Sequence, residues 1–380
     1  MESRACPVCR STEATPLFDN RMLAIGEFDM SYEVGRCQGC GFHFAHRLPP
    51  ASQYGAYYKA ASKYDVASSV SALDRLRIEA AVDLMGRWIP KDHRVVDLGC
   101  GYGAMLAAMR DAGWQRLQGV DPAPQSALRA RENFGLEGIH CGTLDNAHEC
   151  VDLQAADLVC LMAVLEHLPH LRTDLEQLVA RLRPGARLLV EVPAIEGFRA
   201  DGAEPFGEFS IEHIQFFSFA SLRNLLSSLG MQVIAEQAQD LPLAGTGSAF
   251  VLAERTAVPT PAPRAPEPQA RFDAYIADSE RIMQGALQRI PAGRFLVYGA
   301  GSHSARLLPR LPAEAQARIA GVVDGNANLT GKPFGAWTVQ LPATIADTPE
   351  LPILVSSFRA QNDIAASLRS KFPNPLVLLY

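Results

Sequence analysis

The chain has 380 residues, of which 48% are hydrophobic and 20% charged, and it carries a formal net charge of −6. These values are typical of a soluble protein with about two or three globular domains, and the acidic balance argues against a large nucleic-acid interface. Its apolar runs fall short of the roughly 18 residues that cross a membrane, and MESRACPVCR lacks the apolar segment of a secretory signal. We therefore expect a cytoplasmic protein with no membrane partner.

Residues 1–47 contain two Cys-x-x-Cys pairs, Cys6-Pro-Val-Cys9 and Cys37-Gln-Gly-Cys40. A reducing compartment disfavours disulfides, and neither pair accompanies the βαβ pattern of a thioredoxin-like redox site. The spacing lets both thiolates of a pair face a single ion, and four thiolates complete a tetrahedral zinc site with no open position. We therefore predict that residues 1–47 form a zinc-binding module with a structural Zn²⁺. The remaining cysteines are expected to be small core residues; they are Cys100, Cys141, Cys150 and Cys160.

Residues 48–92 begin with a tyrosine-rich connector, QYGAYYKAASKYD, and continue as SALDRLRIEAAVDLMGRWI. The apolar positions of the second stretch recur at helical spacing, which predicts an amphipathic helix. This segment therefore connects the N-terminal module to the next domain.

Residues 93–255 alternate strand and helix patterns. The predicted strands are RVVDLG, LQGVD, GIHCG, ADLVCLMAV and ARLLVEVP, and a final pair, MQVIAEQA and SAFVLAER, suits an antiparallel hairpin at the edge. Helical stretches such as AMLAAMRDAG and HLRTDLEQLVARL separate the first five. This order predicts an α/β fold with a doubly wound, seven-stranded sheet that is covered by helices on both faces.

Residues 256–269 hold five prolines, which predicts a semi-rigid linker. Residues 270–380 then read as a helix followed by a smaller Rossmann-like α/β unit, with FLVYGAGSHSARLLPRL as its first strand, glycine turn and helix. Ser304 stands where a dinucleotide fingerprint has its third glycine, and Asp324 closes the next strand. Two interpretations remain open: this unit binds a nucleotide or nucleotide sugar, or it is structural. No nearby residues suggest hydride transfer.

The run VVDLGCGYG at residues 95–103 carries the strongest functional signal. A strand ends near Asp97 and turns through three glycines into a helix, so that backbone N–H groups can approach a ligand closely. The spacing lacks the dinucleotide pattern G-x-G-x-x-G but matches the D-x-G-x-G-x-G of S-adenosylmethionine (SAM) methyltransferases. Residues from about 93 to 255 resemble a class I SAM-dependent methyltransferase domain.

The resemblance implies a set of SAM-binding residues. They are Asp97, Gly99, Cys100, Gly101, Tyr102, Gly103, Asp121, Pro122, Thr143, Leu144, Asp145, Met162 and Ala163. In such a site Asp97 anchors the ammonium group of SAM, directly or through water, Asp121 accepts the ribose hydroxyls and Asp145 accepts the adenine amino group. Met162 and Ala163 pass beneath the sulfonium.

After the fifth strand, PAIEGFRADGAEPFGEFSIEHIQFFSFASLRNLL is expected to cover the acceptor, with Ser218 as the N-cap of the next helix. Glu212-His213 is a candidate acid–base pair, because an adjacent carboxylate can orient an imidazole and raise its basicity. Alternatively, His213 bonds a loop and Glu212 is solvated. His167, in the stretch LEHL after the fourth strand, has two interpretations as well: it bonds the backbone at a helix entry, or it acts directly in catalysis, in contact with substrate.

The order of these segments resembles the sugar C-methyltransferases that act on nucleotide-linked ketosugars. In that group the histidine of a Glu-His pair removes the proton α to the ketone, and the enolate carbon attacks the methyl group. This resemblance assigns these places to Glu212 and His213, and it implies that Tyr58 and Tyr64 close over SAM or substrate. O- or N-methylation of a similar sugar would need the same SAM pocket. The main alternative is an RNA methyltransferase with a zinc recognition module, which the acidic balance disfavours.

Overall fold

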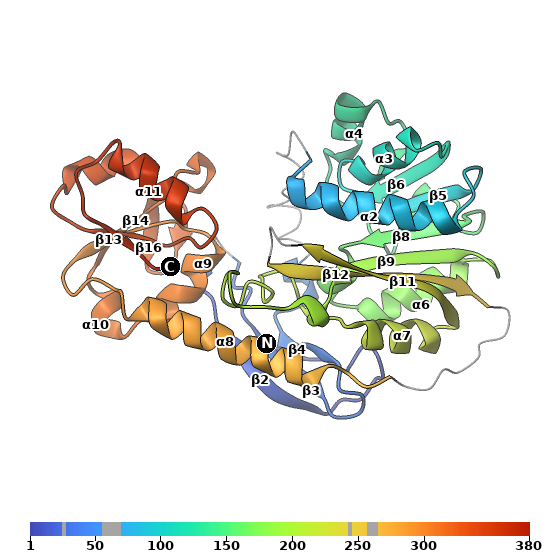
Figure 1. Ribbon diagram of the computed structural model, residues 1–380, viewed down its shortest axis with the longest axis horizontal. Coiled ribbons are helices and arrows are strands. Elements are labelled where there is room, and N and C mark those ends of the chain that lie inside the picture. The colour runs from blue at the N-terminus through green and yellow to red at the C-terminus, as the bar shows by residue number, and fades with distance from the viewer. Residues whose placement is uncertain (25–27, 55–69, 242–244, 257–264) are drawn as a thin grey trace.

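The computed structural model describes residues 1–24, 28–54, 70–241, 245–256 and 265–380, and these residues form three β-sheets (Figure 1). Tyr58 and Tyr64 lie outside the described residues, as does most of the proline-rich stretch 256–269. In the part of the chain that the structure describes, no helix has the length and apolar character needed to cross a membrane.

The first sheet is antiparallel and is built by the N-terminal module. Its order is β1 (Glu2–Ser3), β4 (His43–Leu48), β3 (Tyr32–Cys37) and β2 (Ala14–Asn20). A fifth strand, β10 (Gln215–Phe216), comes from far along the chain and pairs with β4. It lies on the same edge of β4 as β1, which pairs with the other end of that strand. The segment that was expected to cover the acceptor thus contributes a strand to the sheet of the N-terminal module.

The second sheet has seven strands in the order β11-β12-β9-β8-β5-β6-β7. The parallel strands are β5 (Arg94–Leu98), β6 (Arg116–Asp121), β7 (Ile139–Cys141), β8 (Leu158–Met162) and β9 (Arg187–Pro193). An antiparallel hairpin of β11 (Met231–Leu241) and β12 (Thr246–Arg255) completes the edge next to β9. The strand order reverses between β5 and β8, and open α/β sheets bind ligands at the carboxyl ends of the strands beside such a reversal.

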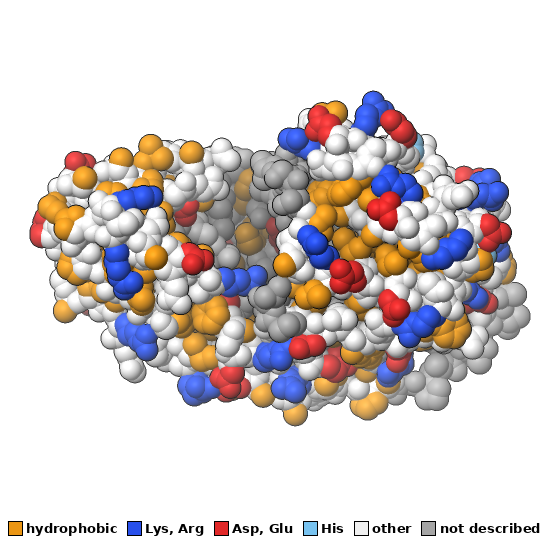
Figure 2. Space-filling view, turned by 45° about the horizontal axis from the view of Figure 1, so that its top comes forward, with side chains coloured by type: hydrophobic (Ala, Val, Ile, Leu, Met, Phe, Trp, Pro, Cys, Tyr) orange, Lys and Arg blue, Asp and Glu red, His pale blue; other side chains and the backbone are white. Residues whose placement is uncertain are grey.

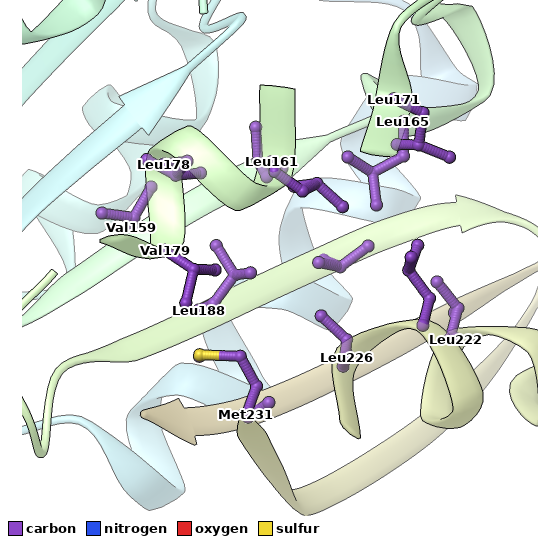
Figure 3. Close-up of a cluster of buried hydrophobic side chains, with 14 of the residues drawn as sticks. Val159, Leu161, Leu165, Leu171, Leu178, Val179, Leu188, Leu222, Leu226 and Met231 are labelled. Carbon is purple, nitrogen blue, oxygen red and sulfur yellow. The ribbon is translucent and has the colours of Figure 1, made fainter. Parts of the chain in front are cut away.

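Helices cover both faces of this sheet because its strands are apolar on both sides (Figure 1). One face packs against α2 (Ala72–Trp88), α3 (Ala104–Asp111) and α4 (Ser126–Phe134). The other packs against α6 (Leu171–Arg181) and α7 (Phe219–Ser228), and Figure 3 shows side chains such as Leu161, Leu178 and Leu226 meeting there. Ser218 caps α7 with a capping box, as predicted.

The third sheet forms the C-terminal unit, with order β15-β16-β14-β13-β17-β18. Its strands are β13 (Phe295–Tyr298), β14 (Ile319–Val323), β15 (Pro333–Phe334), β16 (Trp337–Gln340), β17 (Ile353–Val355) and β18 (Leu376–Leu378), and its helices include α9 (Ser302–Leu307), α10 (Ala313–Gln316) and α11 (Gln361–Arg369). All of its pairings are parallel except β15 with β16.

The long helix α8 (Gln269–Leu287) joins the C-terminal unit to the rest of the molecule through a shared apolar core (Figure 1). The ring of its Phe272 lies 5.6 Å from that of Phe209 and 5.7 Å from that of Phe216, centroid to centroid. The same core includes Val34 of the N-terminal sheet and Val322 of the C-terminal sheet. The C-terminal unit is therefore packed against its neighbours as well as connected through a linker.

Candidate active site and metal cluster

A glycine turn leads from β5 into α3 at the point where the strand order reverses. Gly99, Gly101 and Gly103 all have positive φ, at 80°, 53° and 81°. A Cβ on Gly99 would lie 2.5 Å from Cγ2 of Val164, so that both the space and the backbone conformation call for glycine there. Gly99, Cys100 and Tyr102 of this turn line a crevice beside the carboxyl end of β5.

The crevice gathers several of the predicted SAM residues. Its described lining consists of Asp74, Arg77, Ile78, Asp97, Gly99, Cys100, Tyr102, Ala104, Met105, Met162 and Ala163. Gly101 and Gly103 belong to the same turn, but they are not part of this lining. The predicted adenosine contacts Asp121, Pro122, Thr143, Leu144 and Asp145 are also outside it.

Asp97 gives the crevice an unusual buried carboxyl group. Asp97 is only 2% exposed, and its Oδ1 has no hydrogen-bond partner among the described residues. Burial, together with the nearby carboxylate of Asp121, raises the pKa of Asp97 to about 8. A buried oxygen without a partner is costly, so this position favours a ligand that brings a cationic hydrogen-bond donor.

Asp121 holds the glycine turn in place. Its Oδ2 accepts the N–H of Gly101 at 2.7 Å, and its Oδ1 accepts the N–H of Ala123 at 2.9 Å and the hydroxyl of Ser126 at 2.8 Å. These bonds fix the carboxylate of a residue that is only 3% exposed. The hydrogen bonds show that Asp121 shapes the turn. Contact of Asp121 with a ribose stays a prediction.

The remaining predicted adenine contacts form an exposed turn after β7. The hydroxyl of Thr143 bonds Oδ1 of Asp145 at 2.5 Å and Oδ1 of Asn146 at 3.0 Å. The expectation that Cys141 is a core residue is wrong, because it ends β7 with an exposed side chain. The adenine role of this turn stays a prediction.

Sequence reasoning missed an ion pair beside the crevice. Arg77 of α2 reaches Glu191 of β9, with Nε 2.9 Å from Oε1 and a second nitrogen contacting Oε2. Glu191 is fully buried, and its backbone oxygen accepts the N–H of Ala163, a non-glycine residue with φ of 52°. The available signal was the glutamate in the otherwise apolar strand RLLVEVP, because a buried carboxylate needs a partner.

The structure brings two Glu-His dipeptides together, one after β8 and one before β10. The rings of His167 and His213 meet edge to face with centroids 5.0 Å apart. Nδ1 of His167 lies 3.1 Å from the backbone oxygen of Glu212, and the N–H of Ile214 donates to the backbone oxygen of Glu166 at 2.9 Å. His167 thus bonds the backbone, as the first interpretation has it, and its ring faces the candidate base. A direct role of His167 at the substrate stays a prediction.

The turn that presents His213 has its own support. The hydroxyl oxygen of Ser210 accepts the N–H of Glu212 at 3.2 Å and that of His213 at 3.0 Å. The carboxylate of Glu212 lies 3.9 Å from Nδ1 of His167. Ligand atoms of Glu166, His167 and His213 fall within 4.8 Å of one another. Imidazoles and carboxylates grouped this closely can move a proton at an acceptor.

The four predicted metal ligands form one cluster. The sulfur atoms of Cys6, Cys9, Cys37 and Cys40 all lie within 4.8 Å of one another, with Cys6 3.5 Å from Cys40 and Cys9 3.4 Å from Cys37. Tetrahedral Zn–S bonds of ~2.3 Å would place the sulfurs about 3.8 Å apart. The donor set and its spacing therefore fit a closed tetrahedral metal site.

The C-terminal unit repeats the arrangement of glycine turn and carboxylate. Gly299, with φ of 114°, follows β13, and Asp324 after β14 accepts the N–H of Ala300 at 2.7 Å. The hydroxyl of Ser304 donates to the backbone oxygen of Gly299 at 2.5 Å. A serine at the third glycine position thus braces the turn from inside.

Residues 63–236 match the family model Methyltransf_23, described as a methyltransferase domain. The matched region contains the glycine turn, the crevice residues and both Glu-His dipeptides. The prediction of a methyltransferase domain in this chain is thereby confirmed.

Two curated relatives match parts of the chain. C-methyltransferase NovU from Streptomyces niveus is 29% identical over 235 residues, which are 60% of this chain and 54% of NovU. A tRNA U34 carboxymethyltransferase from Cellvibrio japonicus is 30% identical over 151 residues, 37% of this chain and 46% of that protein. The chain spans about half the length of these relatives.

Among solved structures, 1,6-didemethyltoxoflavin-N1-methyltransferase from Burkholderia thailandensis, with 1,6-didemethyltoxoflavin and S-adenosylhomocysteine bound, matches 61% of this chain and 100% of its own at 19% identity. The TM-score of this match is 0.44.

Proposed function

We propose that this protein is a SAM-dependent methyltransferase that acts on a small-molecule acceptor, a nucleotide-linked sugar, and that it methylates carbon in preference to oxygen or nitrogen. The observation that carries the SAM proposal is the unpartnered Oδ1 of Asp97, buried in a crevice beside the glycine turn of a methyltransferase domain. The α-ammonium group of SAM supplies the charged donor that this oxygen lacks.

SAM brings an electrophilic methyl group on a sulfonium. In the proposal Asp97 binds the ammonium group, while the backbone of the turn from Gly99 to Gly103 packs against the methionyl part. Met162 and Ala163 line the crevice on the β8 side and place an apolar surface beneath the sulfonium. These residues orient the donor, and much of the rate enhancement comes from holding both reactants in line.

His213 is the proposed base, with Glu212 as its partner and His167 as a substrate contact. On a ketosugar, His213 takes the proton from the carbon α to the ketone, and the electron pair of the C–H bond forms an enolate. The enolate carbon bonds the methyl group while the methyl–sulfur bond breaks and its electrons stay on sulfur. The proton remains on His213 until solvent removes it.

Support for the acceptor class comes from the extent of the similarity. The C-methyltransferase matches 60% of this chain, whereas the tRNA carboxymethyltransferase matches 37%. The wider match extends over more than the methyltransferase core, which favours an acceptor like that of a carbon-directed enzyme. We also propose that the Cys cluster holds a structural Zn²⁺ and that residues 270–380 help bind the nucleotide of the acceptor.

The test is methyl transfer from labelled SAM across a panel of nucleotide-linked ketosugars, followed by mass spectrometry. We expect one nucleotide sugar to gain the label on carbon. With that acceptor, His213→Ala is expected to lower kcat by about 100-fold or more and to leave SAM affinity unchanged. His148→Ala, on the separate helix α5 (Ala147–Cys150), is the control. Undetectable SAM binding by the wild type would refute the proposal, and unchanged turnover of H213A would remove the base assignment.

Methylation of RNA is the second candidate, because the relatives include tRNA U34 carboxymethyltransferases. Figure 2 shows basic and acidic side chains interspersed over the described surface of one face, without a basic stripe there. A shift assay with tRNA at increasing salt separates the two candidates. Phosphate contacts would give a steep loss of affinity with salt, and transfer of label to tRNA would favour this alternative.

A further inference from the structure

Arg4, in the N-terminal module, contacts both Glu-His segments of the site. Its guanidinium donates to the backbone oxygens of Ile214 at 2.8 Å, Pro169 at 3.1 Å and Ala45 at 2.6 Å. Ile214 follows His213 directly, and Pro169 lies two residues beyond His167. A single planar cation thus contacts three backbone segments that are remote in sequence, a geometry that suits arginine and not lysine.

Pairing of β10 with β4 strengthens the same junction. The N–H of Ala45 also donates to the backbone oxygen of Ile214, at 2.8 Å, and Gln215 is opposite Phe44 in the sheet. The side chain of Gln215 then donates to the backbone oxygen of Leu168 at 2.9 Å. His213 is therefore presented by a strand that belongs to the sheet of the N-terminal module.

Cysteines of the cluster lie close in sequence to both sides of this junction. Cys6 follows Arg4 by two residues, and Cys40 precedes His43, the first residue of β4, by three. A metal bound by these cysteines would fix Arg4 and the start of β4 relative to each other. The described lining of the crevice contains neither Arg4 nor any residue of β4 or β10.

We propose that Arg4 is a positioning residue for methyl transfer, and that it and the β4–β10 pairing make the placement of His213 depend on the metal in the Cys cluster. The catalytic part of this inference rests on the proposed function. Its consequence is that the N-terminal module controls the transfer step, while the SAM crevice binds its ligand independently of that module.

The test compares Arg4→Met with Arg47→Met. Arg47 also belongs to the N-terminal module, on β4, but its guanidinium is half-exposed and faces Glu33 at 3.7 Å. We expect R4M to bind SAM within about threefold of the wild type and to lose about 100-fold in kcat, with R4K recovering part of that loss. Hydrogen exchange followed by mass spectrometry should accelerate at residues 212–216 in R4M but not at 97–103. R47M should match the wild type in each measurement.

Retention of kcat by R4M within about threefold of the wild type would overturn the proposal. If R4M does not fold, the wild type is treated with a chelator, and metal loss is confirmed by mass spectrometry. The proposal then requires faster exchange at residues 212–216 and loss of transfer with SAM affinity retained. Full transfer without metal, or joint loss of transfer and SAM binding, would overturn it. If H213A turns over normally, the base assignment fails, while the exchange pattern of R4M still decides whether Arg4 orders this segment.

Discussion

Replacing Asp97 by asparagine tests the proposed ammonium site through its pH dependence. Because the pKa of Asp97 is about 8, about 1% of this carboxyl is ionised at pH 6 and about half at pH 8. The α-amino group of SAM, with a pKa of about 8, is fully charged at pH 6 and about half charged at pH 8. The affinity follows the product of the ionised fraction of Asp97 and the charged fraction of the amino group. This product rises about 25-fold from pH 6 to pH 8 and falls at higher pH.

The sign follows from proton linkage. A carboxyl whose pKa is raised in the free protein must lose its proton to bind a cation, so binding below pH 8 releases about one proton. In Asp97→Asn there is no proton to release, and the rise below pH 8 should vanish. Loss of a charge-assisted hydrogen bond of about 1.5–3 kcal/mol lowers affinity about 10- to 100-fold at pH 8, and the gap between variant and wild type narrows toward pH 6.

Isothermal titration with SAM, in buffers of different ionisation enthalpy, measures both the affinity and the proton release. The control is Asp83→Asn, which changes an exposed carboxylate of α2 outside the crevice lining. If the wild-type affinity is flat from pH 6 to pH 8, or if D97N keeps the rise, then Asp97 does not bind the ammonium group.

Three further variants test the surrounding structure. Gly99→Ala should reduce SAM affinity and lower the melting temperature, because it strains a φ of 80° and its Cβ would lie 2.5 Å from Val164; adding V164A should recover only part of the loss. Arg77→Met should lower the free energy of unfolding in urea by about 3–5 kcal/mol, because it leaves the carboxylate of Glu191 buried without its cation; R77M/E191Q should be more stable than R77M. Cys40→Ser should remove the zinc that mass spectrometry finds in the wild type, and a metal-free wild type would refute the zinc assignment.

Patterns in the sequence were sufficient to predict the four cysteines of the metal cluster and the glycine turn. The Cys-x-x-Cys spacing predicted which sulfurs would meet, and they do so within 4.8 Å. The glycines of VVDLGCGYG predicted a turn from strand into helix, and in the structure all three have positive φ, which few other residues adopt. The glycine turn depends on neighbours within a few residues. The cluster joins cysteines 28 and 34 residues apart, and it was predictable because four thiolates in two Cys-x-x-Cys pairs suit a single ion.

Contacts between distant segments could not be predicted in the same way. Arg77 and Glu191 are 114 residues apart, and Arg4 and Ile214 are 210 apart. Their partners depend on strand order and on the addition of β10 to β4, which no local periodicity specifies. The two-residue strand β10 is also too short for its alternation to be visible in sequence. The sequence indicates at most that a partner is required. Glu191, in an apolar strand, requires a cation, but the sequence does not identify which residue supplies it.

The two glycine turns of the molecule show why only one of them suits SAM. In both, the N–H of the first glycine donates to the backbone oxygen of a valine at the end of the neighbouring strand. Gly99 bonds Val120 and Gly299 bonds Val323, each at 2.8 Å. The aspartate that follows each valine accepts another N–H of the same turn. The difference lies two residues before the first glycine. The first unit has Asp97 there, and the second has the fully buried Val297. A valine offers no anion to an ammonium group, so the C-terminal turn lacks the feature on which the SAM proposal depends.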